Sequence, residues 1–255
     1  MAAIVILGAS SGFGAAAARA FARAGFDIVG VHLDRRAAQA QVDALVAEIQ
    51  AEGRSAWFFN QNAADDESRA AILAKVREVC PAGSVHGLLH SLAFGTLSPF
   101  VGERQVTRKQ LEMTLDVMGS SLVYWAQDLV GAGLLGEGGR IWAMTSAGSH
   151  RVWPGYGPVS AAKAVLEATV RQLAVELAPR GITTNAILAG VTDTAALRKI
   201  PGSDKLIAQA SARNPSGRLT TPEDVANLLV LLAQPGANWV NGNVIRVDGG
   251  EDISG

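Results

Sequence analysis

Short apolar runs alternate with longer amphipathic stretches along most of the chain. Each apolar run has the length of a strand, and the stretches between them carry apolar residues at helical spacing over about 10–20 residues. This alternation predicts βαβ units, and therefore a doubly wound, mostly parallel α/β sheet of the Rossmann-like kind. The predicted strands are 3–7, 28–33, 55–59, 85–92, 140–145, 182–188 and 243–247, and the predicted helices are 15–24, 37–51, 66–79, 107–135 (to at least 130), 161–177 and 222–233.

One stretch interrupts this alternation. Residues 190–219 follow the carboxyl end of a predicted strand and hold a weakly amphipathic segment at 195–212. Sheets of this class place substrate-covering elements at this end of their strands, so we expect such a segment at about 190–219. A surface excursion without function is the alternative. No linker or shift in composition divides residues 1–255, and we predict a single domain.

Composition and charge exclude several kinds of protein. Apolar residues make up 49% of the 255 residues, enough for one buried core, and charged residues 18%. A net charge of −1 with no basic block argues against nucleic acid or an anionic membrane as the main partner. Cys80 is the single cysteine, so no intrachain disulfide can form, and we interpret it as structural. We expect a soluble, cytoplasmic protein, because the first strand starts at residue 3 and no apolar stretch resembles a membrane span.

The first predicted strand leads into a turn with three glycines, followed by an alanine-rich helix. Glycines allow the tight turn and let a pyrophosphate approach the backbone, while the helix N-terminus offers free N–H groups and a positive dipole end. This strand–turn–helix context favours a dinucleotide-binding turn over an ordinary turn that merely needs small residues. The candidate phosphate-binding residues are Gly8, Ser10, Ser11, Gly12, Phe13 and Gly14.

Two segments in the second half carry the candidate chemistry. The segment 142–149 ends a strand and contains Ser146, and the segment 153–163 contains Tyr156 and Lys163. Together with the glycine turn and the closing residues 247–250, they resemble the short-chain dehydrogenase/reductase family over essentially the whole chain. The resemblance implies a nicotinamide cofactor and catalysis by a tyrosine and a lysine.

The position of the tyrosine distinguishes branches of that family. Most members place it four residues before the lysine, where this chain has Val159, which can neither donate nor accept a proton. Tyr156 lies seven residues before Lys163, a spacing similar to that of the enoyl-thioester reductases. Gly157 and Pro158 indicate that a helix starts directly after Tyr156.

Three further features resemble the enoyl-reductase branch. The residues 90–95 are similar to its His-Ser-φ-Gly-Phe motif, and Met118 stands where many ketoreductases carry an asparagine. The residues 189–194 resemble its Ala-Gly-Pro-φ-x-Thr motif, although Val191 replaces the proline.

A displaced tyrosine suits conjugate reduction. Hydride then adds to Cβ, and negative charge develops on the more distant thioester oxygen, so the proton donor must stand farther from the nicotinamide. The resemblance implies that Tyr156 donates a hydrogen bond to that oxygen, while Lys163 binds the nicotinamide ribose and stabilises the enolate. The alternatives are a tyrosine that only packs and a lysine that is a solvated helix residue.

Other polar residues near the motif are less decisive. Ser146 matches the family's active-site serine, and its role stays open between a hydrogen bond to substrate and packing. His90 and His150 lie in no triad or metal-ligand spacing, and we interpret both as structural.

The end of the second strand bears on the cofactor. An acid there binds a ribose 2′-hydroxyl, whereas an arginine accommodates a 2′-phosphate. The family's usual aspartate position holds His32, followed by Asp34, Arg35 and Arg36. The guanidiniums favour NADP(H) over NAD(H), although Asp34 keeps NADH open. The remaining candidate cofactor contacts, implied by the resemblance, are Asn62 and Ala63 beside the adenine and Ser91, Gly190 and Thr194.

Large apolar residues near these motifs form a candidate acyl pocket. Phe94, Trp153, Ile200 and Leu206 are the candidates, beside Tyr156, and ordinary core packing is the alternative. The predicted helix 161–177 is apolar on more than one face, which is typical of a helix buried on several sides. The resemblance makes it a subunit-contact helix and implies a homotetramer, and burial within its own subunit is the alternative.

The leading hypothesis is reduction of the C=C bond of a trans-2-enoyl thioester, carried by acyl carrier protein or coenzyme A, with hydride from NADPH. The first alternative is a carbonyl or 3-oxoacyl reductase, or an alcohol dehydrogenase, with a displaced tyrosine. The second is a non-catalytic NAD(P)-binding regulator. The sequence leaves the acyl chain length, the carrier and the pathway open.

Overall fold

The described chain, residues 2–254 of a computed structural model, is built on one parallel sheet. Its seven strands follow the order β3-β2-β1-β4-β5-β6-β7. All six neighbouring pairs are parallel, as the alternating pattern predicted. The strands are β1 (Ala3–Leu7), β2 (Asp27–His32), β3 (Ala56–Asn60), β4 (Val85–His90), β5 (Leu135–Ser146), β6 (Thr183–Ala189) and β7 (Val244–Val247).

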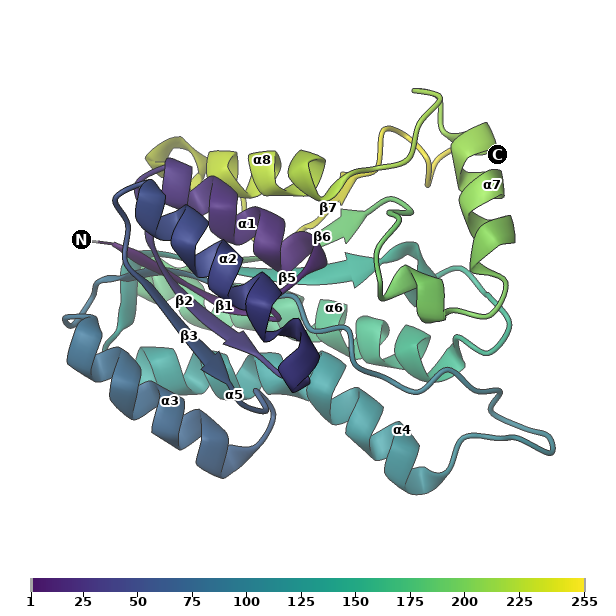
Figure 1. The fold of residues 1–255 in the computed structure, drawn as a ribbon, viewed down its shortest axis with the longest axis horizontal. Helices are drawn as coiled ribbons and strands as arrows, with labels where there is room; N and C mark the ends of the chain where they lie inside the picture. The colour runs from purple at the N-terminus through teal and green to yellow at the C-terminus, as the bar shows by residue number, and fades with distance from the viewer. Residues whose placement is uncertain (1, 255) are drawn as a thin grey trace.

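Helices cover both faces of the sheet (Figure 1). One face carries α1 (Gly12–Arg23), α2 (Gln39–Ala51) and α8 (Pro222–Leu232), and the other α3 (Asp66–Val79), α5 (Ser121–Gly131) and α6 (Gly157–Leu177). Each layer buries its own apolar cluster, with Trp142 and Phe21 stacked on the first side and Trp125 buried on the second. The strand order reverses between β1 and β4, and such a switch point opens a crevice at the carboxyl ends of the strands.

The prediction of one continuous helix over 107–135 is wrong. The structure has α4 (Arg108–Leu115), a π-helical turn at Asp116–Ser120 and then α5. The Ser121 hydroxyl donates to the Val117 carbonyl within this turn, and Gly119 packs so closely on Val165 that a Cβ there would lie 3.0 Å from it. The apolar periodicity continues through the turn, and for that reason the sequence pattern hid it.

The other end of that prediction is also wrong, because Leu135 already belongs to β5. Leu135 pairs with Val85, and the register then shifts so that Arg140 pairs with Gly87. The glycine-rich residues 136–139 lie within this irregular stretch and interrupt the apolar run. The sequence therefore showed only the second half of the strand, from residue 140.

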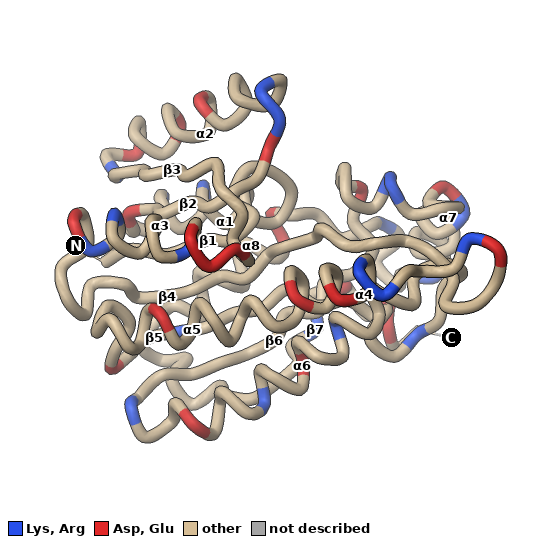
Figure 2. Tube along the Cα trace, turned by 90° about the horizontal axis from the view of Figure 1, so that it is seen from below, with Lys and Arg blue, Asp and Glu red and all other residues tan. Residues whose placement is uncertain are grey.

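Residues 190–219 leave the sheet after β6 and stand away from the main body (Figure 1). They contain a short 3₁₀ turn at Leu197–Lys199 and α7 (Ser203–Arg213), which account for the predicted amphipathic segment. Basic and acidic residues are interspersed on and around α7 (Figure 2). The residues after β7 lie beside α7. No helix within residues 2–254 combines the length and the apolar character that crossing a membrane requires.

Candidate active site

The glycine turn between β1 and α1 has the shape that its sequence predicted. Gly8 has a φ of +85°, and a Cβ there would lie 2.4 Å from the Ser91 carbonyl oxygen. A Cβ on Gly14 would lie 2.0 Å from the Gly8 carbonyl oxygen, so the turn and the helix touch backbone to backbone. Ser11 is the N-cap of α1 but makes no side-chain capping bond, which leaves first-turn N–H groups for an anion. This cradle fits the pyrophosphate of a dinucleotide.

Hydrogen bonds fix the other candidate cofactor-binding residues near this turn. The Ser10 carbonyl accepts a hydrogen bond from the Gln41 side chain at 3.3 Å, and the Ser91 N–H donates to the Leu7 carbonyl. Asn62 caps the next residues through its bond from the Ala64 N–H, and Ala63 is buried with its carbonyl on the indole of Trp125. Ser10, Ser91 and the pair Asn62 and Ala63 follow the carboxyl ends of three parallel strands, at the same end of the sheet.

The loop after β2 carries one acidic side chain, which is bonded to a histidine, and two exposed arginines. His32 is buried, and its Nδ1 lies 2.9 Å from a carboxyl oxygen of Asp34. Asn60 holds the same loop, because its side chain exchanges hydrogen bonds with the backbone of Asp34 at 3.0 and 3.1 Å. Arg35 and Arg36 are exposed and form no ion pair within residues 2–254. The sequence missed Asn60, whose only signal was a polar residue at the end of an aromatic strand.

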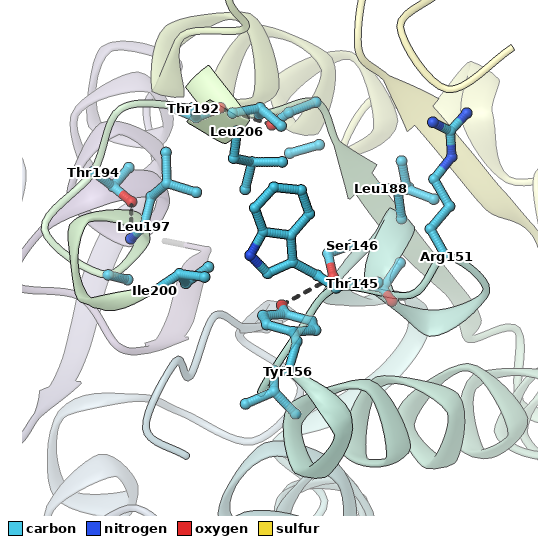
Figure 3. A pocket seen from close by; sticks show the side chains of 18 of the residues that line it. Thr145, Ser146, Arg151, Tyr156, Leu188, Thr192, Thr194, Leu197, Ile200 and Leu206 are labelled. Carbon is cyan, nitrogen blue, oxygen red and sulfur yellow. Dashed lines mark hydrogen bonds between the residues drawn. The ribbon is translucent and has the colours of Figure 1, made fainter. Parts of the chain in front are cut away.

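The structure brings Tyr156 and Ser146 together. Ser146 is the last residue of β5 and Tyr156 is the N-cap of α6, with Pro158 in the first turn as predicted. Their hydroxyl oxygens lie 3.3 Å apart (Figure 3). Val159, at the position where most of the family carries tyrosine, is buried in a small cluster with Met118. The Tyr156 hydroxyl is therefore the phenol available at this place.

Lys163 lies two helical turns after Tyr156 on α6 and is held against the end of β5. It is buried, and its Nζ donates to the Met144 carbonyl at 2.7 Å. Burial lowers the pKa of the Lys163 ammonium to about 8, and the Glu167 carboxylate one helical turn later opposes that shift. Glu167 is itself held by the Thr145 hydroxyl, which donates to it at 2.6 Å.

Burial also decides the protonation of two neighbours. It raises the pKa of the Tyr156 phenol, an effect that the hydrogen bond with Ser146 opposes, so this tyrosine is a neutral proton donor at neutral pH. Burial, together with the charge of Lys163, lowers the pKa of His90 to about 3. His90 is neutral and bonded to the Ser121 hydroxyl at 2.8 Å, and His150 lies on the surface against Asp252.

A cavity of about 430 Å³ opens beside these groups. It lies between the ends of β5 and β6 and residues 190–219, the covering segment predicted from the sequence (Figure 3). The predicted acyl-pocket residues Trp153, Tyr156, Ile200 and Leu206 line it, and so do the predicted cofactor residues Phe13, Gly190 and Thr194. The Trp153 indole donates to the Pro201 carbonyl at 3.1 Å and so joins the loop before α6 to residues 190–219.

The prediction that Phe94 lines the acyl pocket is wrong. Its side chain is 60% exposed and does not line the cavity, although its neighbours Ala93 and Gly95 do. Phe94 lies in a loop without regular secondary structure, so its motif position did not fix where the ring points. The sequence also missed the charged wall of the cavity, formed by Arg151, Arg213, Asp248, Glu251 and Asp252.

Comparisons with known proteins agree with this geometry. The family model described as enoyl-(acyl carrier protein) reductase matches residues 8–251. The enoyl-acyl-carrier-protein reductase (NADH) of Aquifex aeolicus (strain VF5) is 33% identical over 174 residues, which are 68% of this chain and 64% of that protein. The 1-cyclohexenylcarbonyl-CoA reductase of Streptomyces collinus is 30% identical over 255 residues, covering 98% of this chain and 86% of that protein.

A solved structure shows the same likeness over the complete fold. The crystal structure of the Bacillus cereus enoyl-acyl carrier protein reductase with NADP+ and indole naphthyridinone gives a TM-score of 0.89 at 28% identity. The superposition covers 100% of this chain and 97% of that one. Fold, motif spacing and these matches lead to one assignment: the chain belongs to the enoyl-acyl-carrier-protein reductase family, a group of NAD(P)H-dependent oxidoreductases of the short-chain dehydrogenase/reductase type.

Proposed function

We propose that this protein reduces the C=C bond of a trans-2-enoyl thioester with hydride from NADPH. The observation that carries the proposal is the place of Tyr156, whose hydroxyl lies in the cavity beside Ser146 while the usual tyrosine position holds the buried Val159. A donor moved back along the chain suits an oxygen remote from the carbon that gains hydride. The family match supports the same reaction.

The cofactor would lie along the carboxyl ends of the strands. The glycine turn would hold the pyrophosphate, Asn62 and Ala63 would border the adenine, and Thr194 and Gly190 would contact the nicotinamide end. When bound, the nicotinamide supplies the hydride for Cβ of the substrate. Lys163 would bind the nicotinamide ribose, because its ammonium is fixed by the Met144 carbonyl and still has two N–H donors.

The residues of the chain then act on the thioester oxygen. Tyr156 donates its hydrogen bond to that oxygen as negative charge develops there, and the buried Lys163 ammonium stabilises the charge. Ser146 orients the Tyr156 hydroxyl through their 3.3 Å contact. The apolar side chains of Trp153, Ile200 and Leu206 cover the acyl group and exclude water.

For the cofactor we propose NADP(H). Arg35 and Arg36 are exposed and unpaired within residues 2–254, whereas the Asp34 carboxyl is already engaged by His32. The Aquifex relative is named for NADH, and the Bacillus cereus structure contains NADP+, so the relatives do not decide the question. Steady-state kinetics with both cofactors test the proposal. We expect a higher kcat/KM for NADPH, and a clear preference for NADH would overturn the assignment of NADP(H).

We propose that the acyl group arrives on acyl carrier protein or coenzyme A, and that the chain assembles into a homotetramer. Val165 and Val175 of α6 are 38% and 72% exposed, so this helix leaves apolar side chains for a second subunit. Light scattering on the purified protein tests the assembly. A substrate series of increasing chain length on both carriers tests the thioester.

The reaction itself is tested by incubating the protein with NADPH and either a crotonyl or an acetoacetyl thioester. NADPH absorbance should fall only with the crotonyl substrate. Consumption only with the acetoacetyl substrate would make the protein a ketone reductase. Tight NADPH binding without turnover on either substrate would make it a non-catalytic binding protein.

A further inference from the structure

Two points of the covering segment, near its start and at the end of α7, bond to one carboxylate. Glu251 lies in the turn after β7 and is only 4% exposed. Its Oε2 accepts a hydrogen bond from the Val191 N–H at 2.9 Å, and its Oε1 accepts one from Nη2 of Arg213 at 3.2 Å. Val191 is the second residue after β6, where the segment leaves the sheet, and Arg213 is the last residue of α7, where it returns. A single side chain thus ties residues 191 and 213 together.

The contact at Val191 depends on the absence of a proline. The enoyl-reductase motif that the sequence resembles has proline at this position, and proline has no N–H to donate. Gly190 is equally necessary, because a Cβ there would lie 2.9 Å from Oε2 of Glu251 and 2.3 Å from Oγ1 of Thr220. The replacement of proline by Val191 therefore supplies the N–H group from which the buried Glu251 carboxylate accepts a hydrogen bond.

The Arg213 guanidinium is committed to this contact. Glu251 is its charge partner within residues 2–254, and its Nε is buried there without a hydrogen-bond partner. Asn214, next in the chain, donates to the Asp248 carbonyl at 2.8 Å and fastens the same end to the turn after β7. Glu251 and Arg213 also line the cavity, so the contact forms part of its wall.

We propose that Glu251 is a positioning residue that holds residues 190–213 closed over the cavity, with Val191 and Arg213 as its two partners. The inference deepens the proposed function, on which its kinetic consequence rests. With the contact intact, Thr192, Thr194, Ile200 and Leu206 stay at the cavity. Without it, the hydrogen bonds of Gly190 to the Val247 carbonyl, of Trp153 to the Pro201 carbonyl and of Asn214 to the Asp248 carbonyl remain, and substrate binds to a less ordered wall.

Limited trypsin digestion tests the position of the segment without any activity. Arg198, Lys199 and Lys205 are exposed cleavage sites inside it. Cleavage tracks the population of the open form, and losing hydrogen bonds to a charged group should raise that population about tenfold in E251A. V191P removes one donor and keeps the ion pair, so we expect roughly a threefold effect. E251Q, which still accepts a hydrogen bond, should fall between the wild type and E251A.

Kinetics then separate positioning from general stability. E251A should raise the KM for the enoyl thioester about tenfold and change kcat far less, because the catalytic groups on β5 and α6 are untouched. The matched control is E48A, which removes a Glu–Arg pair with Arg19 between α1 and α2, remote from the cavity. We expect wild-type cleavage and wild-type KM for E48A.

Several outcomes would overturn the proposal. They are unchanged cleavage at the three sites in both E251A and V191P, a fall in kcat with unchanged KM, or equal effects of E251A and E48A. If the wild type reduces no enoyl thioester, the proposed function fails, and the digestion of the same variants still decides whether Glu251 closes the segment.

Discussion

The two sides of the cavity are built in different ways. The proposed catalytic side consists of the end of β5 and the start of α6, where Tyr156, Ser146 and the buried Lys163 are fixed by the sheet and a 21-residue helix. The covering side, residues 190–219, has one short helix and a 3₁₀ turn and depends on a few polar contacts. We therefore expect the chemistry to depend on the sheet and the long helix, whereas fit to the acyl group should depend on a segment that can be altered without unfolding the core.

Changing the catalytic side at Tyr156 should have the largest effect. Tyr156→Phe removes the hydroxyl and keeps the ring, so we expect kcat to fall about 10²- to 10⁴-fold, the range for losing a positioned proton donor. NADPH affinity and melting temperature should stay near the wild type, because the ring is kept and the one hydrogen bond of the hydroxyl within residues 2–254 is that with Ser146. A kcat within about twofold of the wild type would remove Tyr156 from the mechanism.

The proposed 2′-phosphate site should give the next largest effect. Replacing Arg35 and Arg36 together by alanine should lower kcat/KM for NADPH by about 10- to 100-fold, because charge-assisted hydrogen bonds are lost. The kcat/KM for NADH should change little, so the ratio of the two is the measurement. Arg54→Ala serves as the control, because this half-buried arginine bonds to the Gly25 carbonyl near the opposite end of β2. Equal losses with both cofactors would contradict a 2′-phosphate contact.

The covering side should respond more weakly and in a different parameter. Leu206→Ala removes apolar contact with the acyl group, so the KM for the enoyl thioester should rise about three- to tenfold, growing with chain length. Leu206 is only partly buried, so stability should hardly change. Leu231→Ala, a 64% exposed leucine on α8, is the control. A fall in kcat equal to that of Tyr156→Phe would contradict the contrast between the two sides.

We expect the smallest effect in the pH dependence of activity, which tests the charge of Lys163 on the catalytic side. Lys163 is charged below its pKa of about 8, so activity that needs the ammonium should decline as pH rises through that value. Glu167 raises the Lys163 pKa, and Glu167→Gln should therefore shift this decline to lower pH. Glu176→Gln on the same helix, whose partner is Gln172, should leave the profile unchanged. An unchanged profile, or a shift to higher pH, would contradict a stabilising action of Glu167 on the Lys163 ammonium.

The sequence predicted what local patterns determine. Strand order aside, the alternation gave the parallel sheet, and the dipeptide Gly157-Pro158 gave the start of α6 directly after Tyr156. The pattern failed at the π-helical turn and at Phe94, where tertiary packing and loop geometry decide. It was silent on Glu251, because the partners Val191 and Arg213 are 60 and 38 residues away along the chain and meet only in the fold.

The direct measurement is the fate of a labelled hydride. The protein would be incubated with a crotonyl thioester and NADPH carrying deuterium at C4 of the nicotinamide on either face, and the product examined by mass spectrometry and NMR. We expect a saturated butyryl thioester with the deuterium on Cβ from one of the two labelled cofactors. Turnover of only a ketone substrate, with the deuterium on a carbinol carbon, would contradict it.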